Sequence, residues 1–204
     1  MQVQIRSRSR VALHRLVPAF PMRITASRGE QHLTRRGFQR PLREGESVSI
    51  PAFESVDLQL TGAIFSPSEC RLELDGFTVD TATRQIHAQV HDMESRILYL
   101  RELISGSVFQ EPQKIWNADI VADALQTTPD KIRSALFTQG AAFTQLCRTQ
   151  RLMRAFFESF QFNLTVADLK ARVGWSDAGD LEASFLDWFG VSLQTISRLR
   201  EDCL

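Results

Sequence analysis

The chain has 204 residues, of which 43% are hydrophobic and 24% are charged, close to the average of a soluble globular protein. This composition excludes a wholly disordered chain and a collagen-like repeat, and no apolar run reaches the ~18 residues of a membrane-spanning helix. The formal net charge of zero argues against a protein that binds anions through bulk charge alone. At roughly 100–200 residues per domain, the length allows one domain or two small ones.

The charges are nevertheless separated along the chain. Residues 1–45 carry ten arginines against two glutamates, whereas residues 46–95 carry nine acidic residues against two arginines. A basic segment of this kind can serve as an arm that binds nucleic acid or a membrane surface, and its Arg- and Ser-rich composition is also typical of a transit peptide. Because an acidic segment follows directly, we expect the two segments to pair with each other in the folded protein.

The cysteines and the N-terminal segment do not indicate export. Arg15 interrupts the apolar stretch 11–20, so a secretory signal is not expected. Cys70, Cys147 and Cys203 are odd in number and widely spaced, which predicts neither a disulfide framework nor a zinc site. A reducing, cytoplasmic environment fits best.

From about residue 20 to residue 80 the sequence predicts β-structure. Polar and apolar residues alternate in 45–51, 56–60 and 70–74, and an Asp-Gly turn at 75–76 follows the third segment. Alternation with a period of two is typical of half-buried antiparallel strands. We therefore expect a small sheet or partial barrel.

The pattern changes near Thr83. Apolar residues recur at spacings of four and three from Ile86 to Ile104, which predicts a helix of about five turns. This stripe can cover the preceding sheet or pair with its twin in a homodimer, and the sequence leaves both interpretations open. A Gly- and Pro-containing stretch, 106–112, is predicted to be a linker.

From Ile115 onward the sequence predicts helices, in two units of the same kind. Each unit is a short helix, a tight turn and a second helix that begins at a polar cap and ends at a glycine. The predicted helices are 118–125 and 129–138 in the first unit, 166–172 and 178–188 in the second, and 143–160 between them. A helix-turn-helix presents one exposed helix to a DNA major groove, and two could reach groove faces about 34 Å apart. Small helical bundles give similar spacings without binding DNA, so the pattern alone leaves both open.

The back half of the chain resembles the AraC/XylS family of bacterial transcription regulators. The resemblance is carried by Arg-Leu-Met-Arg-Ala at 151–155, Val-Gly-Trp-Ser-Asp at 173–177 and Phe-Gly-Val-Ser at 189–192. It covers about residues 113–204. It implies two helix-turn-helix subdomains that bind double-stranded promoter DNA sequence-specifically in the major groove, and activation of transcription through contact with RNA polymerase.

The front half is similar to the β-rich sensor portion found in this family only in 45–60. The expected fold class is α+β. A small β-rich domain, a partial barrel or cupin-like, spans 1–110 and ends in a helix, and an all-α DNA-binding domain spans 113–204. The chain length is closest to compact regulators of bacterial virulence and secretion genes, some of which need a protein co-activator.

Residue-by-residue matching to the family places candidate DNA contacts on both units. Arg133 is the best candidate for a bidentate contact to guanine, and the helix starts at Thr128 and Ser176 can present backbone N–H groups to phosphate. Three further arginines either contact phosphate or pack against the protein, and the sequence does not distinguish these roles. The other exposed positions of the recognition helices are Asp130, Lys131, Ser134, Gly179 and Asp180, and the three arginines are Arg148, Arg151 and Arg172.

The second unit has few side chains that are suited to reading bases. Its recognition helix exposes Asp180 and Glu182 without a basic residue, and 113–204 hold ten basic against eleven acidic residues. Because phosphates repel carboxylates, we expect the first unit to do most of the base reading. The alternative function is a protein-interaction module that keeps the regulator fold and docks a partner protein through the acidic second unit.

The sequence does not predict an enzyme. It lacks a phosphate-binding glycine loop, a Gly-x-Ser-x-Gly elbow and a convincing Cys–His pair. His87 and His91 could coordinate a metal from one face of a helix, but no third ligand is evident. A solvent-exposed helix face is the simpler interpretation. We therefore expect no catalytic residues, metal or cofactor, although a small-molecule sensor with an apolar pocket in the front half is a third possibility.

Overall fold

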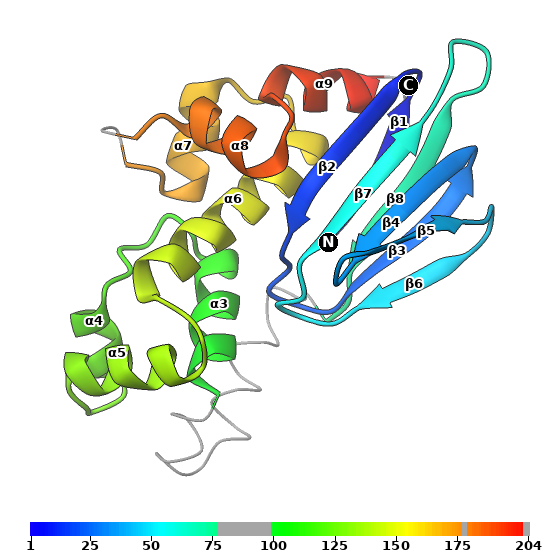
Figure 1. Cartoon of the computed structure of the whole chain (residues 1–204). Coiled ribbons are helices and arrows are strands. Elements are labelled where there is room, and N and C mark those ends of the chain that lie inside the picture. Colours follow the sequence, from blue (N-terminus) through cyan, green and yellow to red (C-terminus); the bar gives the residue numbers. More distant parts are fainter. Residues whose placement is uncertain (77–98, 177–178, 202–204) are drawn as a thin grey trace.

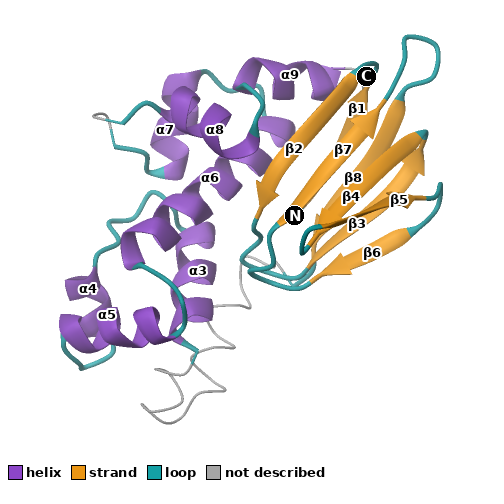
Figure 2. Ribbon diagram, in the orientation of Figure 1, coloured by secondary structure: helices purple, strands orange, loops and turns teal. Residues whose placement is uncertain are grey.

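The computed structural model describes residues 1–76, 99–176 and 179–201. In this part of the chain a β-domain is followed by a helical domain (Figure 1 and Figure 2). One antiparallel sheet has the strand order β1-β8-β3-β6 and the other has the order β2-β7-β4-β5. The strands are β1 Gln2–Ser7, β2 Arg10–Leu16, β3 Met22–Arg28, β4 Glu30–Arg35, β5 Phe38–Leu42, β6 Ser47–Ile50, β7 Val56–Thr61 and β8 Ser68–Leu74.

Alternating burial explains why these segments form strands. In β7, Val56, Leu58 and Leu60 are buried, whereas the residues between them are half-buried. Successive side chains of a strand point to opposite faces of a sheet, so the apolar set of each strand enters one core between the two sheets. The strands predicted in 45–51, 56–60 and 70–74 are confirmed by β6, β7 and β8.

The β-structure begins much earlier than the sequence analysis predicted. It starts at Gln2 rather than near residue 20. Val3 and Ile5 of β1 alternate with polar residues and are buried, and Val11 and Leu13 of β2 are buried on either side of the half-buried Ala12. Arg6, Arg8 and Arg10 interrupt the alternating pattern in the sequence, so these strands were not predicted. Their side chains are half-buried or exposed in the structure.

Basic side chains of the first 45 residues pair with the acidic segment that follows, as predicted. Arg6 lies 3.3 Å from Glu69, Arg23 lies 3.2 Å from Asp75, and Arg40 lies 2.6 Å from Glu46. Arg35 and Arg36 share the carboxylate of Glu54. The side chains of these pairs are partly exposed, and ion pairs that water can reach contribute little free energy, so they balance charge between strands more than they stabilise the sandwich.

The helices confirm the two repeated units and correct their ends. The observed helices are α3 Leu100–Gln110, α4 Ala118–Ala124, α5 Pro129–Thr138, α6 Phe143–Gln161, α7 Val166–Val173, α8 Leu181–Phe189 and α9 Leu193–Glu201. Side chains of Asn117, Thr128 and Thr165 accept hydrogen bonds from the first turns of α4, α5 and α7, as the sequence predicted. The second helix of the second unit, α8, begins at Leu181 rather than at residue 178, because Asp180 is its N-cap. The predictions of a helix start at Ser176 and of a recognition-helix position at Gly179 are therefore wrong, since both residues precede the helix.

The predicted linker at 106–112 is wrong over most of its length. Residues 106–110 are the last part of α3. Gly106 is buried there, and a Cβ atom at this position would lie 3.5 Å from the ring of Phe20. The helix therefore packs against Phe20 of the β-domain at this position, with room for a small side chain. Of the predicted apolar stripe from Ile86 to Ile104, the structure describes only the end, where Leu100 and Ile104 are buried.

The described residues pack into two separate apolar clusters. The larger cluster joins the core between the two sheets to the C-terminal half of α6 and to α7, α8 and α9. The smaller cluster joins α3, α4 and α5 to the first turns of α6. The second helix-turn-helix unit therefore shares its core with the β-domain, whereas the first unit stands apart on α3 (Figure 1).

Candidate nucleic-acid interface

The helix α5 projects from the first unit. Ile132 and Leu136 are buried against α3 and α4 and hold the helix in place. The opposite face is exposed, and it carries Asp130, Lys131, Arg133 and Ser134 at the positions predicted from the sequence. Phe137 is also exposed on this helix, although no sequence signal predicted it at the interface.

Arg133 is held by a carboxylate of its own helix. Its Nη1 atom donates a hydrogen bond of 2.9 Å to Oδ1 of Asp130, one turn earlier. Both side chains are exposed, and an exposed pair of this kind contributes little free energy. The guanidinium can therefore leave Asp130 for a stronger acceptor. Thr128 caps the helix start by accepting from the N–H of Lys131.

The second recognition helix presents an acidic face. Leu181, Phe185 and Phe189 of α8 are buried in the larger cluster. Asp180 accepts a hydrogen bond of 3.1 Å from the N–H of Ala183 and so serves as the cap of this helix. The exposed positions of α8 carry Glu182, Ala183, Leu186 and Asp187.

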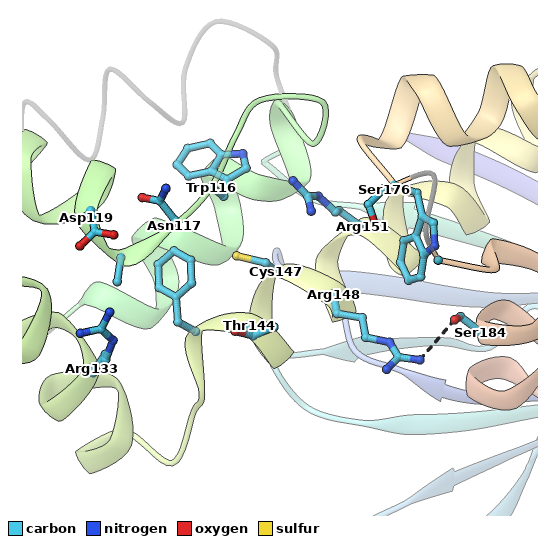
Figure 3. Close-up of a pocket in the computed structure, with 14 residues that line it drawn as sticks. Trp116, Asn117, Asp119, Arg133, Thr144, Cys147, Arg148, Arg151, Ser176 and Ser184 are labelled. Atoms are coloured by element: carbon cyan, nitrogen blue, oxygen red, sulfur yellow. Dashed lines mark hydrogen bonds between the residues drawn. The ribbon is translucent and has the colours of Figure 1, made fainter.

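A groove of about 520 Å³ lies between the two units. In Figure 3, Arg133 and Asn117 of the first unit line one side, Ser176 and Ser184 of the second unit line the other, and Arg148 of α6 lies between them. Gly179 also lines this groove. The linker helix α6 thus forms a floor that connects the two helix-turn-helix units.

The three arginines that the sequence left undecided have different surroundings. Arg151 donates to the main-chain oxygens of Pro112 and Lys114, each at 3.1 Å, and so holds the connection between α3 and α4. Arg172 donates to the buried carboxylate of Glu158 at 2.9 Å. Arg148 remains on the exposed surface of the groove.

Arg148 links α6 to the second recognition helix. Its Nη2 atom donates a hydrogen bond of 3.3 Å to Oγ of Ser184. Ser184 was not among the residues predicted from the sequence, because a serine inside a helix carries no special signal. Its place three residues after the buried Leu181 could have indicated that it faces the linker helix.

The groove also contains one buried thiol. Cys147 is 5% exposed, and burial raises its pKa to about 11 although Arg151 opposes the shift. The thiol is therefore protonated at neutral pH and is a poor nucleophile or metal ligand. Among the described residues, no three His, Cys, Asp or Glu side chains form a group that could hold a metal ion. His87 and His91 lie outside the described residues.

None of the helices in the described ranges combines the length and the apolar composition that a membrane crossing requires.

The curated relatives of this chain are transcription regulators. It is 35% identical over 88 residues to the urease operon transcriptional activator of Escherichia coli, a match that covers 43% of this chain and 28% of that protein. It is 25% identical over 107 residues to the HTH-type transcriptional regulator AdiY of Escherichia coli K12, a match that covers 50% of this chain and 42% of AdiY. The chain therefore spans less than half the length of both relatives. No family model matches the chain.

The fold is similar to that of ToxT from Vibrio cholerae O395. The TM-score is 0.68 over 98% of this chain and 97% of ToxT, at 9% sequence identity. This likeness concerns the fold alone, and it includes both the β-domain and the helical domain. Together, the transcription regulators among the curated relatives and the fold shared with ToxT confirm the resemblance to the AraC/XylS family.

Proposed function

We propose that this chain is a sequence-specific DNA-binding transcription regulator, that it activates transcription, and that it is located in the cytoplasm. The observation that carries the proposal is the exposed face of α5, which presents Lys131 and Arg133 on a helix anchored by Ile132 and Leu136. A rigid helix of this kind fits the major groove. The similarity of this chain to a transcriptional activator over 88 residues supports the same function.

The first unit does most of the base reading. Arg133 leaves Asp130 and donates two hydrogen bonds to the O6 and N7 atoms of a guanine, which is the contact that best distinguishes this base. Lys131 contacts phosphate or a base edge, and Ser134 lies beside Arg133 on the same face. In the N-terminal turn of α5, Pro129 has no N–H group and Thr128 accepts from Lys131, so the backbone N–H of Asp130 is the one that faces a phosphate.

The groove between the units accommodates the DNA backbone. Arg148 exchanges its hydrogen bond with Ser184 for a phosphate oxygen, which is a stronger, charged acceptor. Ser176 and Gly179 border the same groove and contact the backbone without carrying sequence information. Arg151 and Arg172 support the interface by holding the chain segments around it, as their hydrogen bonds indicate.

The second unit contributes less to affinity because its exposed face is acidic. Glu182 and Asp187 are repelled by phosphates, and Asp180 is occupied as a helix cap. This acidic face, with the exposed Leu186 within it, favours the alternative function, in which the second unit docks a partner protein. RNA polymerase is the partner that an activator requires. A protein co-activator and a homodimer formed by the helix from Ile86 to Ile104 remain predictions.

Selection of bound duplexes from a random pool, followed by titration of the selected duplex, tests the proposal. We expect affinity to fall steeply with salt, because a protein that neutralises several phosphates releases counterions. Arg133→Ala should weaken specific binding by about 1–3 kcal/mol and relax the preference at one guanine. Arg71→Ala, an exposed arginine on β8 far from the groove, is the matched control. A protein that enriches no duplex at low salt, yet captures RNA polymerase, would favour the alternative function.

A further inference from the structure

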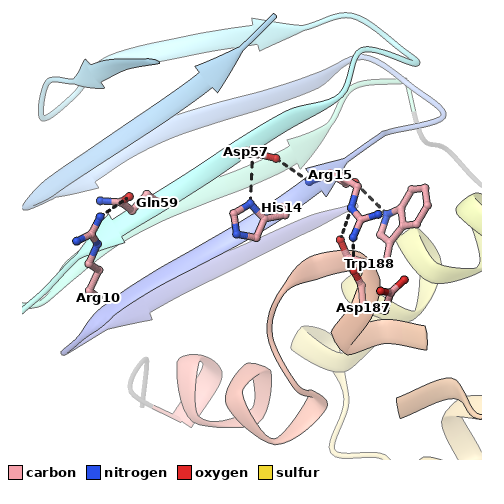
Figure 4. Close-up of polar contacts among 7 residues, drawn as sticks. All are labelled: Arg10, His14, Arg15, Asp57, Gln59, Asp187 and Trp188. Atoms are coloured by element: carbon pink, nitrogen blue, oxygen red, sulfur yellow. Dashed lines mark hydrogen bonds and ion pairs between the residues drawn. The ribbon is translucent and has the colours of Figure 1, made fainter. Parts of the chain in front are cut away.

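The C-terminal end of α8 is fastened to the β-domain by one arginine of β2. Arg15 donates through Nε to the main-chain oxygen of Trp188 at 2.9 Å and through Nη2 to the main-chain oxygen of Asp187. In return, the indole Nε1 of Trp188 donates to the main-chain oxygen of Arg15 at 3.1 Å. Figure 4 shows these contacts, which we call the Arg15 clamp.

The chemistry of the clamp suits a helix end. The last carbonyl groups of a helix have no partner within the helix and carry a partial negative charge. The planar guanidinium of Arg15 meets two of them at once and also lies over the Trp188 ring, with Cζ 4.9 Å from the ring centroid. A lysine could supply the charge but not two parallel donors and a stacking face.

The backbone of β2 is distorted at the point where the clamp forms. The pairing of β2 with β7 shifts register between Leu13 and Leu16, which is the signature of a bulge. Arg15 has a φ of 50°, in the left-handed region that non-glycine residues rarely adopt. Its N–H donates to Oδ1 of Asp57 at 2.8 Å, so a residue of the neighbouring strand secures the unusual conformation. The bulge turns Arg15 out of the sheet and toward α8.

The end of α8 also fits closely against His14. Gly190 terminates the helix with a φ of 74°, and a Cβ atom at this position would lie 2.5 Å from Cδ2 of His14. The imidazole is itself held by Asp57, whose Oδ2 atom lies 3.5 Å from Nδ1. A side chain at position 190 would therefore collide with the imidazole, and either His14 or the helix end would have to move.

We propose that Arg15 is a positioning residue for the second helix-turn-helix unit: it holds the unit on the β-domain, so that the β-domain sets the angle between α8 and α5. The inference rests on the proposed function for its consequence on DNA. Two observations support the proposal. One is the Arg15 clamp, and the other is that α7, α8 and α9 belong to the same apolar cluster as the sheets, whereas α5 belongs to the smaller cluster. Within the described residues, a structural change in the β-domain therefore reaches the second unit directly and the first unit through α6 and α3.

Amide hydrogen exchange of the full chain tests the clamp without DNA. In Arg15→Ala we expect faster exchange at the end of α8 and in α9, by at least about tenfold for the loss of one charge-assisted hydrogen bond, with α5 unchanged. Arg15→Lys should recover only part of this protection. Arg10→Ala is the matched control, because Arg10 lies on the same strand and donates to Gln59 rather than to α8. Unchanged exchange in Arg15→Ala, or an equal increase in α5, would overturn the proposal.

The consequence for DNA is measured on the selected duplex and on a shorter duplex that holds only the site of the first unit. Arg15→Ala should weaken binding to the long duplex and leave binding to the short one unchanged, with partial recovery in Arg15→Lys. Equal weakening on both duplexes contradicts a positioning role. If the native protein binds neither duplex, the proposed function fails, while the exchange measurement still decides whether Arg15 holds α8.

Discussion

Glu158 of α6 and Arg172 of α7 form an ion pair in which Oε2 and Nη2 lie 2.8 Å apart, although the Glu158 side chain is only 2% exposed. The other carboxylate oxygen pairs with Arg154 at 2.6 Å. Arg172 also lies over the ring of Phe162, 4.7 Å from its centroid. One buried carboxylate therefore joins the linker helix to the second unit.

Loss of this carboxylate should destabilise the protein markedly. Glu158→Gln leaves two arginines without their acidic partner, and removal of one member of a buried pair lowers the free energy of unfolding by roughly 3 kcal/mol. Urea denaturation followed by circular dichroism measures the change. Glu182→Gln, on the exposed face of α8, is the control and should change the free energy of unfolding by less than about 0.5 kcal/mol. A similar small change in Glu158→Gln would show that the pair is dispensable.

Two glycines with the same backbone conformation should respond differently to alanine. Gly140 has a φ of 69° and open space around it, so Gly140→Ala should lower the free energy of unfolding by about 1–2 kcal/mol from backbone strain alone. Gly174 has a φ of 62°, and a Cβ atom there would collide with the main-chain oxygen of Pro112 and lie 2.7 Å from Cα of Gln113. Gly174→Ala should therefore be clearly the more destabilised variant in thermal unfolding. Equal losses would mean that the segment at Pro112 moves aside freely.

Alanine substitution of Arg148 should affect DNA binding, whereas alanine substitution of Arg151 should affect the stability of the fold. Arg148→Ala removes one phosphate contact, and the slope of log affinity against log salt should fall by about 0.9 while the free energy of unfolding changes little. Arg151→Ala leaves the carbonyls of Pro112 and Lys114 without their donor, and the free energy of unfolding should fall by about 1–3 kcal/mol. Fluorescence anisotropy of a labelled duplex and urea denaturation make the two measurements. The reverse assignment of the two effects would refute the distinction drawn from their hydrogen bonds.

The carboxylate of Glu54 should make stability depend on pH. The hydrogen bond from Arg35 holds the pKa of Glu54 below its ordinary value of 4.5 in the folded protein. Because the pKa is depressed on folding, this pair stabilises the protein above pH 4.5 and the contribution is lost as pH falls through the folded-state pKa. Glu54→Gln should therefore be less stable than the native protein at neutral pH and approach it in acid. Arg35→Gln should behave in the same way, and a difference that persists undiminished at low pH would contradict the ion pair as its cause.

Local order along the chain was predictable from the sequence because it depends on neighbours only a few residues away. The caps at Asn117, Thr128 and Thr165 follow from side chains that satisfy N–H groups three residues later. The projection of α5 follows from the spacing of Ile132 and Leu136. Strand alternation at β7 and β8 is local in the same sense, and the AraC/XylS resemblance added the arrangement of the two units.

Tertiary structure alone decided which of several equivalent residues packs and which stays exposed. Arg151 reaches Pro112, 39 residues away, and Arg172 reaches Glu158, 14 residues away, whereas Arg148 remains at the groove. The Arg15 clamp joins residues 173 positions apart. No period or spacing encodes such contacts, because they depend on how the β-domain and the helices meet in space. The sequence by itself determined the helices, the strands and the helix caps of this protein. Long-range packing decided which of its arginines form structural contacts and which stay exposed at the groove.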